Sequence, residues 1–164
     1  MNKGIKSGQI IEFEKDDRIG PFFAKNWGNN FIVSKGKTVY GKDLPGFMTL
    51  KDNSIIGLLT YHLENNFCEI VTLDSLMPSV GIGSALIQKM IDKAKNKKYS
   101  RLWLITTNDN IDAMKFYQRR GFVIKAVYPN AIEESRKLKQ NIPKIGDYGI
   151  PIRDEIELEY PLVS

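Results

Sequence analysis

The chain of 164 residues contains only one cysteine and one histidine. A single thiol, Cys68, excludes an internal disulfide framework and a thiolate metal cluster, and a single imidazole, His62, excludes a site that needs two histidine ligands. The longest uncharged stretch, residues 75–88, is short for a bilayer span and contains Pro78 and two glycines. The first residues include no hydrophobic segment of signal-peptide length. We therefore expect a cytoplasmic protein that binds no metal and does not enter a membrane.

The composition, 42% apolar and 26% charged, is that of a globular chain, and the length suits a single domain over residues 1–164. The formal net charge of +5 is concentrated in residues 88–101, where six basic residues accompany only Asp92. Such a patch suits a phosphate-bearing small molecule as well as a nucleic acid, although a solvated helix face is the plainer explanation. Only Tyr99 and Trp103 lie near these lysines, so we expect no nucleic-acid partner.

Turn residues divide the first half of the chain into short segments. Asp16 and Asp17 precede a helical region within the first thirty residues, although Gly20-Pro21 interrupts the pattern. Short β-prone runs follow at residues 31–34, 38–40, 46–51, 55–63 and 67–73. Such close spacing between turns is typical of an antiparallel meander.

In the second half of the chain, helical periods alternate with strand periods. An apolar stripe over residues 82–94 predicts a helix, and residues 101–106 predict a strand. A strand reached through a helix normally lies parallel to the strand before it. Two more helices are expected after Asn110 and Asn130, with a strand at residues 122–128 between them.

The turn that opens the first amphipathic helix reads Gly81-Ile82-Gly83-Ser84. Glycines at a strand-to-helix turn let the backbone approach an anion closely, and the unpaired N–H groups of the first helical turn bind phosphate oxygens. Close packing of the helix on the strand explains such glycines about as well. The turn is not a Walker loop, because no Gly-Lys-Ser/Thr follows, and it lacks the third glycine of a dinucleotide-binding fingerprint.

A second motif lies one strand further along the chain and reads Asn110-x-x-Ala113-x-x-Phe116-Tyr117-x-x-x-Gly121-Phe122. Together with the glycine turn it resembles the GNAT superfamily of N-acetyltransferases, which move an acetyl group from acetyl-CoA to an amine. The resemblance covers nearly all of the chain in element order and is strongest over residues 69–122. It implies an α+β fold of three layers. In that fold a mixed central sheet, built from an antiparallel meander and a β-α-β-α unit, has helices on both faces.

The resemblance also implies an acetyl-CoA site. The family's pyrophosphate loop has Arg or Gln, two residues, Gly, one residue, then Gly or Ala. Gly81 and Gly83 fit, whereas Pro78 stands at the Arg or Gln position, so the backbone N–H groups of the loop must contribute more. A splay in the preceding strand, here residues 73–76, frees further N–H groups for the thioester. The implied cofactor residues are Leu73, Ser75, Leu76, Ser79, Val80, Gly81, Ile82, Gly83, Ser84, Asn110 and Tyr117.

Acetyl transfer requires a proton acceptor, because an amine of pKa about 10.4 is mostly protonated at neutral pH. The family's general acid is a tyrosine at the position of Tyr117. A phenol of pKa about 10 gives its proton to a thiolate of pKa about 8.5 at a cost of roughly 2 kcal/mol, so Tyr117 is also expected to stabilise the thiolate by a hydrogen bond. Glu69 stands where several family members have a carboxylate that acts through water. A solvent-facing glutamate is the alternative, and His62 is a second base candidate.

The last segment, residues 155–160, alternates glutamates with apolar residues and predicts a strand. The resemblance puts this strand inside the sheet. Glu155 and Glu157 then either face a wet acceptor cleft and attract a cationic amine, or pair with Arg or Lys from the first helical region. Trp27 belongs to the core or to the wall of that cleft, and residues 142–153 would then form a mobile wall or lid over it.

Two functional hypotheses follow. The first is a GNAT-type N-acetyltransferase that moves an acetyl group from acetyl-CoA to a primary amine of a small molecule or protein by direct attack in a ternary complex. The second is a non-catalytic acyl-CoA-binding sensor of the same fold, which Pro78 leaves open. The family often dimerises, so the resemblance also allows a homodimer.

Overall fold

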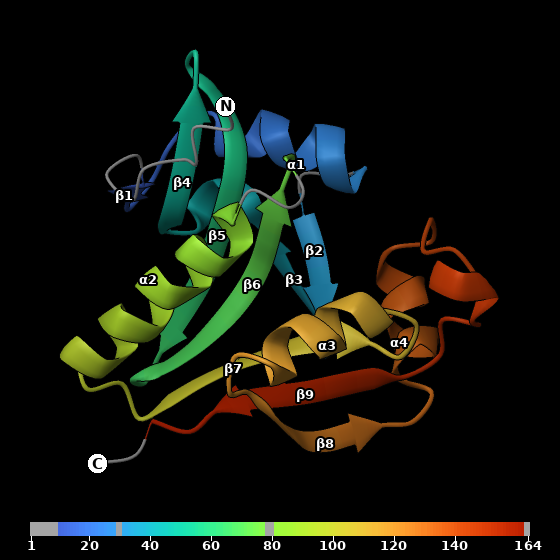
Figure 1. Cartoon of the computed structure of the whole chain (residues 1–164). Coiled ribbons are helices and arrows are strands. Elements are labelled where there is room, and N and C mark those ends of the chain that lie inside the picture. The colour runs from blue at the N-terminus through green and yellow to red at the C-terminus, as the bar shows by residue number, and fades with distance from the viewer. Residues whose placement is uncertain (1–9, 29–30, 78–80, 163–164) are drawn as a thin grey trace.

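The computed structural model describes residues 10–28, 31–77 and 81–162. In chain order the elements are β1 (Ile10–Phe13), α1 (Ile19–Trp27), β2 (Phe31–Ser34), β3 (Lys37–Tyr40), the 3-10 turn η2 (Gly41–Asp43), β4 (Gly46–Lys51), β5 (Ser54–Glu64), β6 (Phe67–Ser75), α2 (Ile82–Asn96), β7 (Arg101–Thr107), α3 (Ile111–Gln118), β8 (Val123–Tyr128), α4 (Ala131–Leu138), the 3-10 turn η3 (Asp147–Gly149) and β9 (Glu155–Tyr160). Seven strands form one sheet in the order β1-β4-β5-β6-β7-β9-β8 (Figure 1).

Neighbouring strands of this sheet are antiparallel except β6 and β7, which are parallel and joined through α2. The mixed sheet, the meander β4-β5-β6 and the β-α-β-α unit that follows it are therefore confirmed. The predicted meander was wrong in its first part. Within the described residues, β2 and β3 pair only with each other and form a separate hairpin.

The first thirty residues differ from the helical region expected there. Ile10–Phe13 forms the edge strand β1, paired with β4, and helix α1 begins only at Ile19. Gly20-Pro21 does not interrupt this helix, because Pro21 lies in the first turn, where a backbone N–H has no acceptor within the helix. The helix then buries Phe22 and Phe23 against the sheet.

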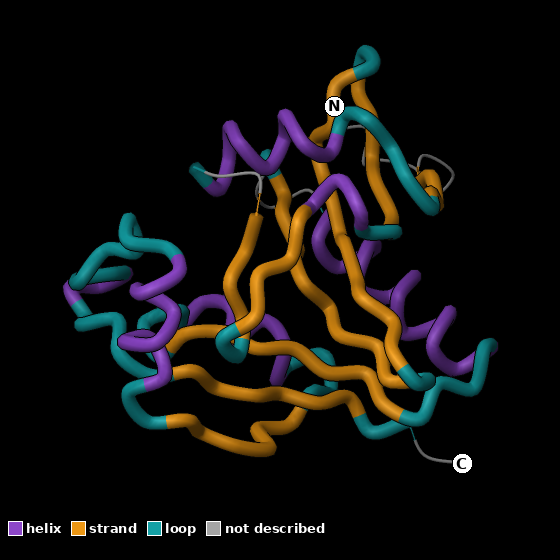
Figure 2. The backbone as a smooth tube through the Cα atoms, turned by 180° about the vertical axis from the view of Figure 1, so that it is seen from behind, coloured by secondary structure: helices purple, strands orange, loops and turns teal. Residues whose placement is uncertain are grey.

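Successive residues of a strand point to opposite faces of the sheet, so apolar side chains emerge on both faces. Helices cover each of these faces. On β5, Leu59 belongs to the core under α2, whereas Leu58 belongs to the core under α1. Helix α3 lies on the α2 side (Figure 1), and the β2–β3 hairpin packs on the α1 side (Figure 2). The first turn of α2 comes close to the sheet at Gly57, where a Cβ atom would lie 2.3 Å from Ile82. None of the helices in the described ranges combines the length and apolar character needed to cross a membrane.

The interior strand β9 carries glutamates on one face, and cations from the β2–β3 turn, β7 and β8 neutralise them. Glu157 accepts three hydrogen bonds, from Lys35 Nζ at 2.8 Å, Arg101 Nη2 at 2.6 Å and the Tyr128 hydroxyl at 2.9 Å. Arg101 also pairs with Glu159, and the Lys35 N–H donates to Glu155 at 3.3 Å. The ion pairs expected for these glutamates are present. Their partners, however, come from the β2–β3 turn, β7 and β8, not from the first helical region.

These contacts predict that Glu157→Gln destabilises the protein. Burial raises the pKa of the Glu157 carboxyl, but the hydrogen bonds from Lys35, Tyr128 and Arg101 outweigh burial and hold the pKa below its usual 4.5. The charged form therefore stabilises the fold above that pH, and the stabilisation is lost as the pH falls through the lowered pKa. We expect the substitution to lower the free energy of unfolding by about 2 kcal/mol at neutral pH. In urea titrations the difference should shrink below pH 4.5.

Glu155→Gln is the matched control on the same face of β9. Burial is the main reason that the pKa of Glu155 is raised, so its ionisation costs stability as the pH rises through that pKa. A glutamine oxygen can still accept the Lys35 N–H. This variant should therefore keep or increase the free energy of unfolding at neutral pH, and equal losses in the two variants would contradict the assignment.

Candidate active site

Strands β6 and β7 separate in the middle of the sheet. They pair over residues 67–70 and 101–104, after which β6 continues along β5 and β7 continues along β9. Val71 is an extra residue in the register of β6 with β5, a bulge that begins the divergence. Beyond it, the facing edges of the two strands have no strand partner among the described residues. The opening includes residues 73–76, for which a splay was expected.

A cavity of about 110 Å³ lies between the separated strands. Its walls are the facing segments of β6 and β7, Trp27 of α1, and Asn110, Ala113 and Tyr117 of α3. The structure therefore brings together four residues predicted for the site: Trp27, Leu73, Asn110 and Tyr117. Asn110 also caps α3, because its Oδ1 accepts the N–H of Ala113 at 3.3 Å.

Tyr117 is the titratable side chain of α3 that faces this gap. Its ring packs edge-on against Phe116 and Phe122, with centroids 5.2 and 5.3 Å away, and only 8% of the residue is exposed. Burial raises the pKa of its hydroxyl, and the nearby carboxylate of Asp74 raises it further. The hydroxyl is therefore protonated at neutral pH and has a proton to donate to a ligand.

Asp74 is a residue that sequence reasoning missed. Its Oδ2 accepts a hydrogen bond from Trp27 Nε1 at 3.2 Å, which joins the end of α1 to the open end of β6. Burial raises the pKa of Asp74 to about 6, although the indole hydrogen bond acts in the opposite direction. The sequence carried no signal for it, because an aspartate near the end of a strand is ordinarily a turn residue.

The described part of the glycine turn leaves the start of α2 without a side-chain cap. Gly81 is the N-cap of α2 with φ of +81°, a left-handed conformation that glycine adopts without strain. Because glycine has no side chain to cap the helix, the N–H groups of the first turn are left for a ligand. Ser79 and Val80, two of the predicted loop residues, lie outside the described residues together with Pro78.

Arg120 adds a guanidinium to this turn. Its Nη2 donates to Ser84 Oγ at 2.5 Å, and its Cζ lies 3.6 Å from the centroid of the Phe116 ring. Gly83 faces the same ring, since a Cβ atom on Gly83 would lie 3.6 Å from Phe116. The sequence spacing predicts that Arg120 lies on the same helix face as Phe116 and Tyr117. Spacing alone does not reveal that this face contacts α2.

Three other predicted cofactor residues have roles within the fold. Ile82 is buried in the core under α2. The Leu76 N–H donates to the Ile56 carbonyl at 2.9 Å, and Ser75 Oγ donates to the Met77 carbonyl at 3.3 Å. These bonds hold the chain between β6 and the glycine turn.

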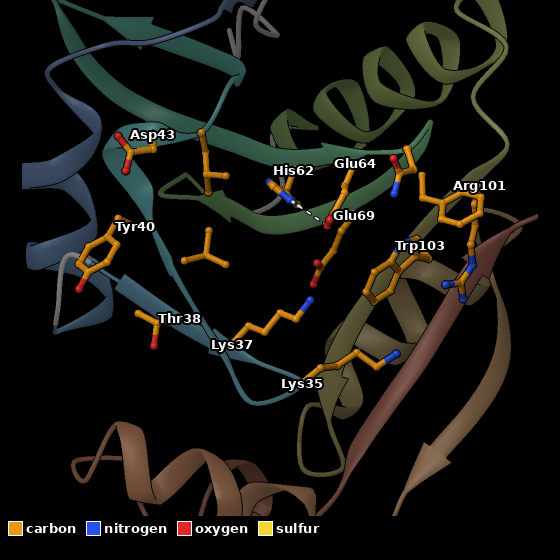
Figure 3. Close-up of a pocket in the computed structure, with 14 residues that line it drawn as sticks. Lys35, Lys37, Thr38, Tyr40, Asp43, His62, Glu64, Glu69, Arg101 and Trp103 are labelled. Atoms are coloured by element: carbon orange, nitrogen blue, oxygen red, sulfur yellow. Dashed lines mark ion pairs between the residues drawn. The ribbon is translucent and has the colours of Figure 1, made fainter.

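A second cavity, of about 520 Å³, lies between the sheet and the β2–β3 hairpin (Figure 3). Its charged lining residues are Lys35, Lys37, Asp43, Glu64, Glu69 and Arg101. Both predicted base candidates, Glu69 and His62, line this cavity, and His62 Nε2 lies 3.6 Å from Glu64 Oε2. The predicted acceptor residues Trp27, Glu155 and Glu157 are not among its lining residues. The described residues contain no group of three or more His, Cys, Asp or Glu side chains that could hold a metal ion.

Glu69 lies at the boundary between the two cavities. It is in register with Trp103, one position before the last paired residues of β6 and β7, Ile70 and Leu104. Glu69 lines the larger cavity, whereas Ile70 and Val71 line the gap between the strands. A carboxylate and a phenol thus stand on either side of the point where the strands part.

Residues 142–153, the predicted lid, are tied to the start of α3. The N–H of Asp147 donates to Asp109 Oδ2 at 3.0 Å, and the Tyr148 hydroxyl donates to Asp112 Oδ1 at 2.6 Å. None of these residues lines the 520 Å³ cavity. The wall of that cavity opposite the sheet is instead the β2–β3 hairpin.

Comparison with known proteins agrees with this geometry. The protein YdhI of Bacillus subtilis strain 168, which is uncharacterized, is 45% identical over 136 residues, or 82% of this chain and 85% of YdhI. A GNAT family acetyltransferase from Elizabethkingia anophelis, solved with acetyl-CoA bound, is 29% identical, with a TM-score of 0.60 over 71% of this chain and 75% of that one.

An acetyltransferase from Bacillus subtilis, solved in complex with CoA, has the same fold at 19% identity, with a TM-score of 0.66 over 94% of this chain and 99% of that one. The model of the Acetyltransferase (GNAT) family matches residues 12–122, more than half of the sequence. The chain therefore belongs to the GNAT acetyltransferase family.

Proposed function

We propose that this protein is an N-acetyltransferase that transfers the acetyl group of acetyl-CoA to a primary amine. The observation that carries the proposal is the position of Tyr117 in the gap between β6 and β7, with the uncapped first turn of α2 on one side and Glu69 on the other. A proton acceptor, a hydrogen-bond donor for the leaving sulfur and a phosphate site then lie around the same gap.

The donor is assigned to the α2–α3 face. The N–H groups after Gly81 and the guanidinium of Arg120 would hold the pyrophosphate of acetyl-CoA, and the unpaired edge of β6 would bind the thioester end. Arg120 supplies a positive donor beside Ser84, which compensates for the proline at the family's Arg or Gln position. The acetyl-CoA bound to the Elizabethkingia relative supports the assignment of this ligand.

The acceptor is assigned to the 520 Å³ cavity. Its amine loses a proton to Glu69, directly or through a water, and the nitrogen lone pair attacks the thioester carbonyl carbon. A new C–N bond forms, the C–S bond breaks, and the electron pair leaves on the CoA sulfur. The products are an acetylated amine and CoA.

Tyr117 acts on the departing sulfur. A hydroxyl whose pKa is raised gives up its proton less readily than an ordinary phenol, so full transfer to the thiolate is more strongly uphill than for a free tyrosine. Its chief contribution is therefore a hydrogen bond that strengthens as negative charge develops on sulfur. The proton that finally resides on CoA balances the one taken from the amine.

The chemical role of Tyr117 is tested by Tyr117→Phe, which deletes only the hydroxyl. We expect kcat to fall about 10²-fold, with little change in the KM for acetyl-CoA, because the bond acts mainly in the transition state. Thiol release with a panel of amines measures both constants. Tyr61→Phe, another buried tyrosine outside both cavities, is the control and should keep wild-type kinetics. Wild-type turnover by Tyr117→Phe would refute the assignment.

The donor site is tested by Gly83→Val. A Cβ atom at this position is in ordinary contact with Phe116, so the added methyl groups fill the space between α2 and α3. We expect calorimetry to detect no acetyl-CoA binding, while the melting temperature stays close to that of the wild type. Gly20→Val, in the first turn of α1 with nothing within 4 Å of its Cβ, is the control. Unchanged affinity in Gly83→Val would exclude the glycine turn as the binding site.

A further inference from the structure

The charges that line the 520 Å³ cavity are not equivalent. Lys35 and Arg101 point into the network of β9 glutamates, where Glu157 accepts a hydrogen bond from each of them. Their cations also lie over the Trp103 ring, at 5.0 and 4.8 Å from its centroid. These two cations are already compensated by the protein itself.

Lys37 differs from them. Its ammonium forms no ion pair or hydrogen bond with any other residue in the described part of the chain, although its backbone pairs with Ser34 in the hairpin. Figure 3 shows its side chain extending from β3 into the cavity, toward the wall that carries Glu69. A lysine directed into a cavity without a protein carboxylate as its partner is a ready receptor for an anionic group of a ligand.

The wall of the cavity opposite Lys37 carries carboxylates. Glu69 lies on it next to the point where β6 and β7 part, and Glu64 stands beside His62 further along the same wall. An amine that approaches the thioester from this cavity therefore meets a carboxylate, while another group of the same molecule meets the Lys37 ammonium. A second amine at that place would be repelled.

We propose that the acceptor is a small amine that also bears an anionic group, a carboxylate or a phosphate, and that Lys37 binds the anion. The inference rests on the proposed acetyltransferase function and specifies its substrate class. It distinguishes amino-acid-like acceptors from diamines, polyamines and other purely cationic amines. A lysine ammonium is a point charge without the fork geometry of arginine, so it accepts either anion.

The experiment compares matched pairs of amines that differ only in the anion. The carboxylate pair is γ-aminobutyrate against butylamine, and the phosphate pair is phosphoethanolamine against ethanolamine. Thiol release gives kcat/KM for each, and calorimetric titration of the CoA complex gives their affinities without turnover. We expect the anionic member of at least one pair to be favoured by about tenfold or more, mainly through KM. The pair in which this occurs identifies the anion.

Lys37→Gln then provides the residue-level test. It should remove the preference by raising KM for the anionic amine about tenfold, with the KM for acetyl-CoA and the KM for the amine without the anion unchanged. Lys51→Gln, on β4 outside the cavity, is the control and should keep the preference.

The outcomes separate this inference from the proposed function. Equal or better binding and turnover of the purely cationic members, or a preference that survives Lys37→Gln, would overturn the inference and leave the acetyltransferase assignment intact. Binding of anionic amines without thiol release from any amine would support the cavity's specificity and overturn the proposed function. Failure of every amine to bind would overturn the inference as well.

Discussion

The parting of β6 from β7 is the constraint on which the site depends. Parallel strands that separate inside a sheet leave backbone donors and acceptors unpaired, and such groups are costly unless a ligand or water satisfies them. The opening is maintained from both sides, because β6 stays paired with β5 and β7 stays paired with β9. Because the fold already holds the gap open, a ligand that enters it does not have to supply free energy to separate the strands. The site is in this sense preorganised.

The glycine turn and Tyr117 lie on one face of the sheet, and the cavity with Glu69 lies on the other. On one face, α2 begins without a side-chain cap, α3 brings Tyr117 to the gap, and Arg120, just after α3, reaches Ser84 in the first turn of α2. On the other face, the β2–β3 hairpin closes a cavity over Glu69, and the contact of Lys35 with Glu157 joins that hairpin to β9. The buried charge network is thus structural, and it supports the wall from which Lys37 extends.

Local patterns predicted much of this arrangement. The change from strand to helix at the glycine turn, the motif around Tyr117 and the alternation in residues 155–160 all depend on neighbours in the chain, and each corresponds to an element of the structure. The errors occurred where tertiary contacts decide. Residues 10–13 form a strand only because β4 offers an edge, and Pro21 is tolerated only because the helix starts immediately before it.

The sequence by itself determined the order of the elements from β2 onward, the family resemblance and the residues at the glycine turn, because periodicity and turn chemistry act over a few residues. Only the tertiary structure decided which polar and charged side chains meet. Lys35 reaches Glu157 across 122 positions of the chain, Trp27 reaches Asp74 across 47, and Arg120 reaches Ser84 across 36. No local pattern encodes such pairs, because they depend on how the strands are ordered in the sheet and on which face each side chain emerges.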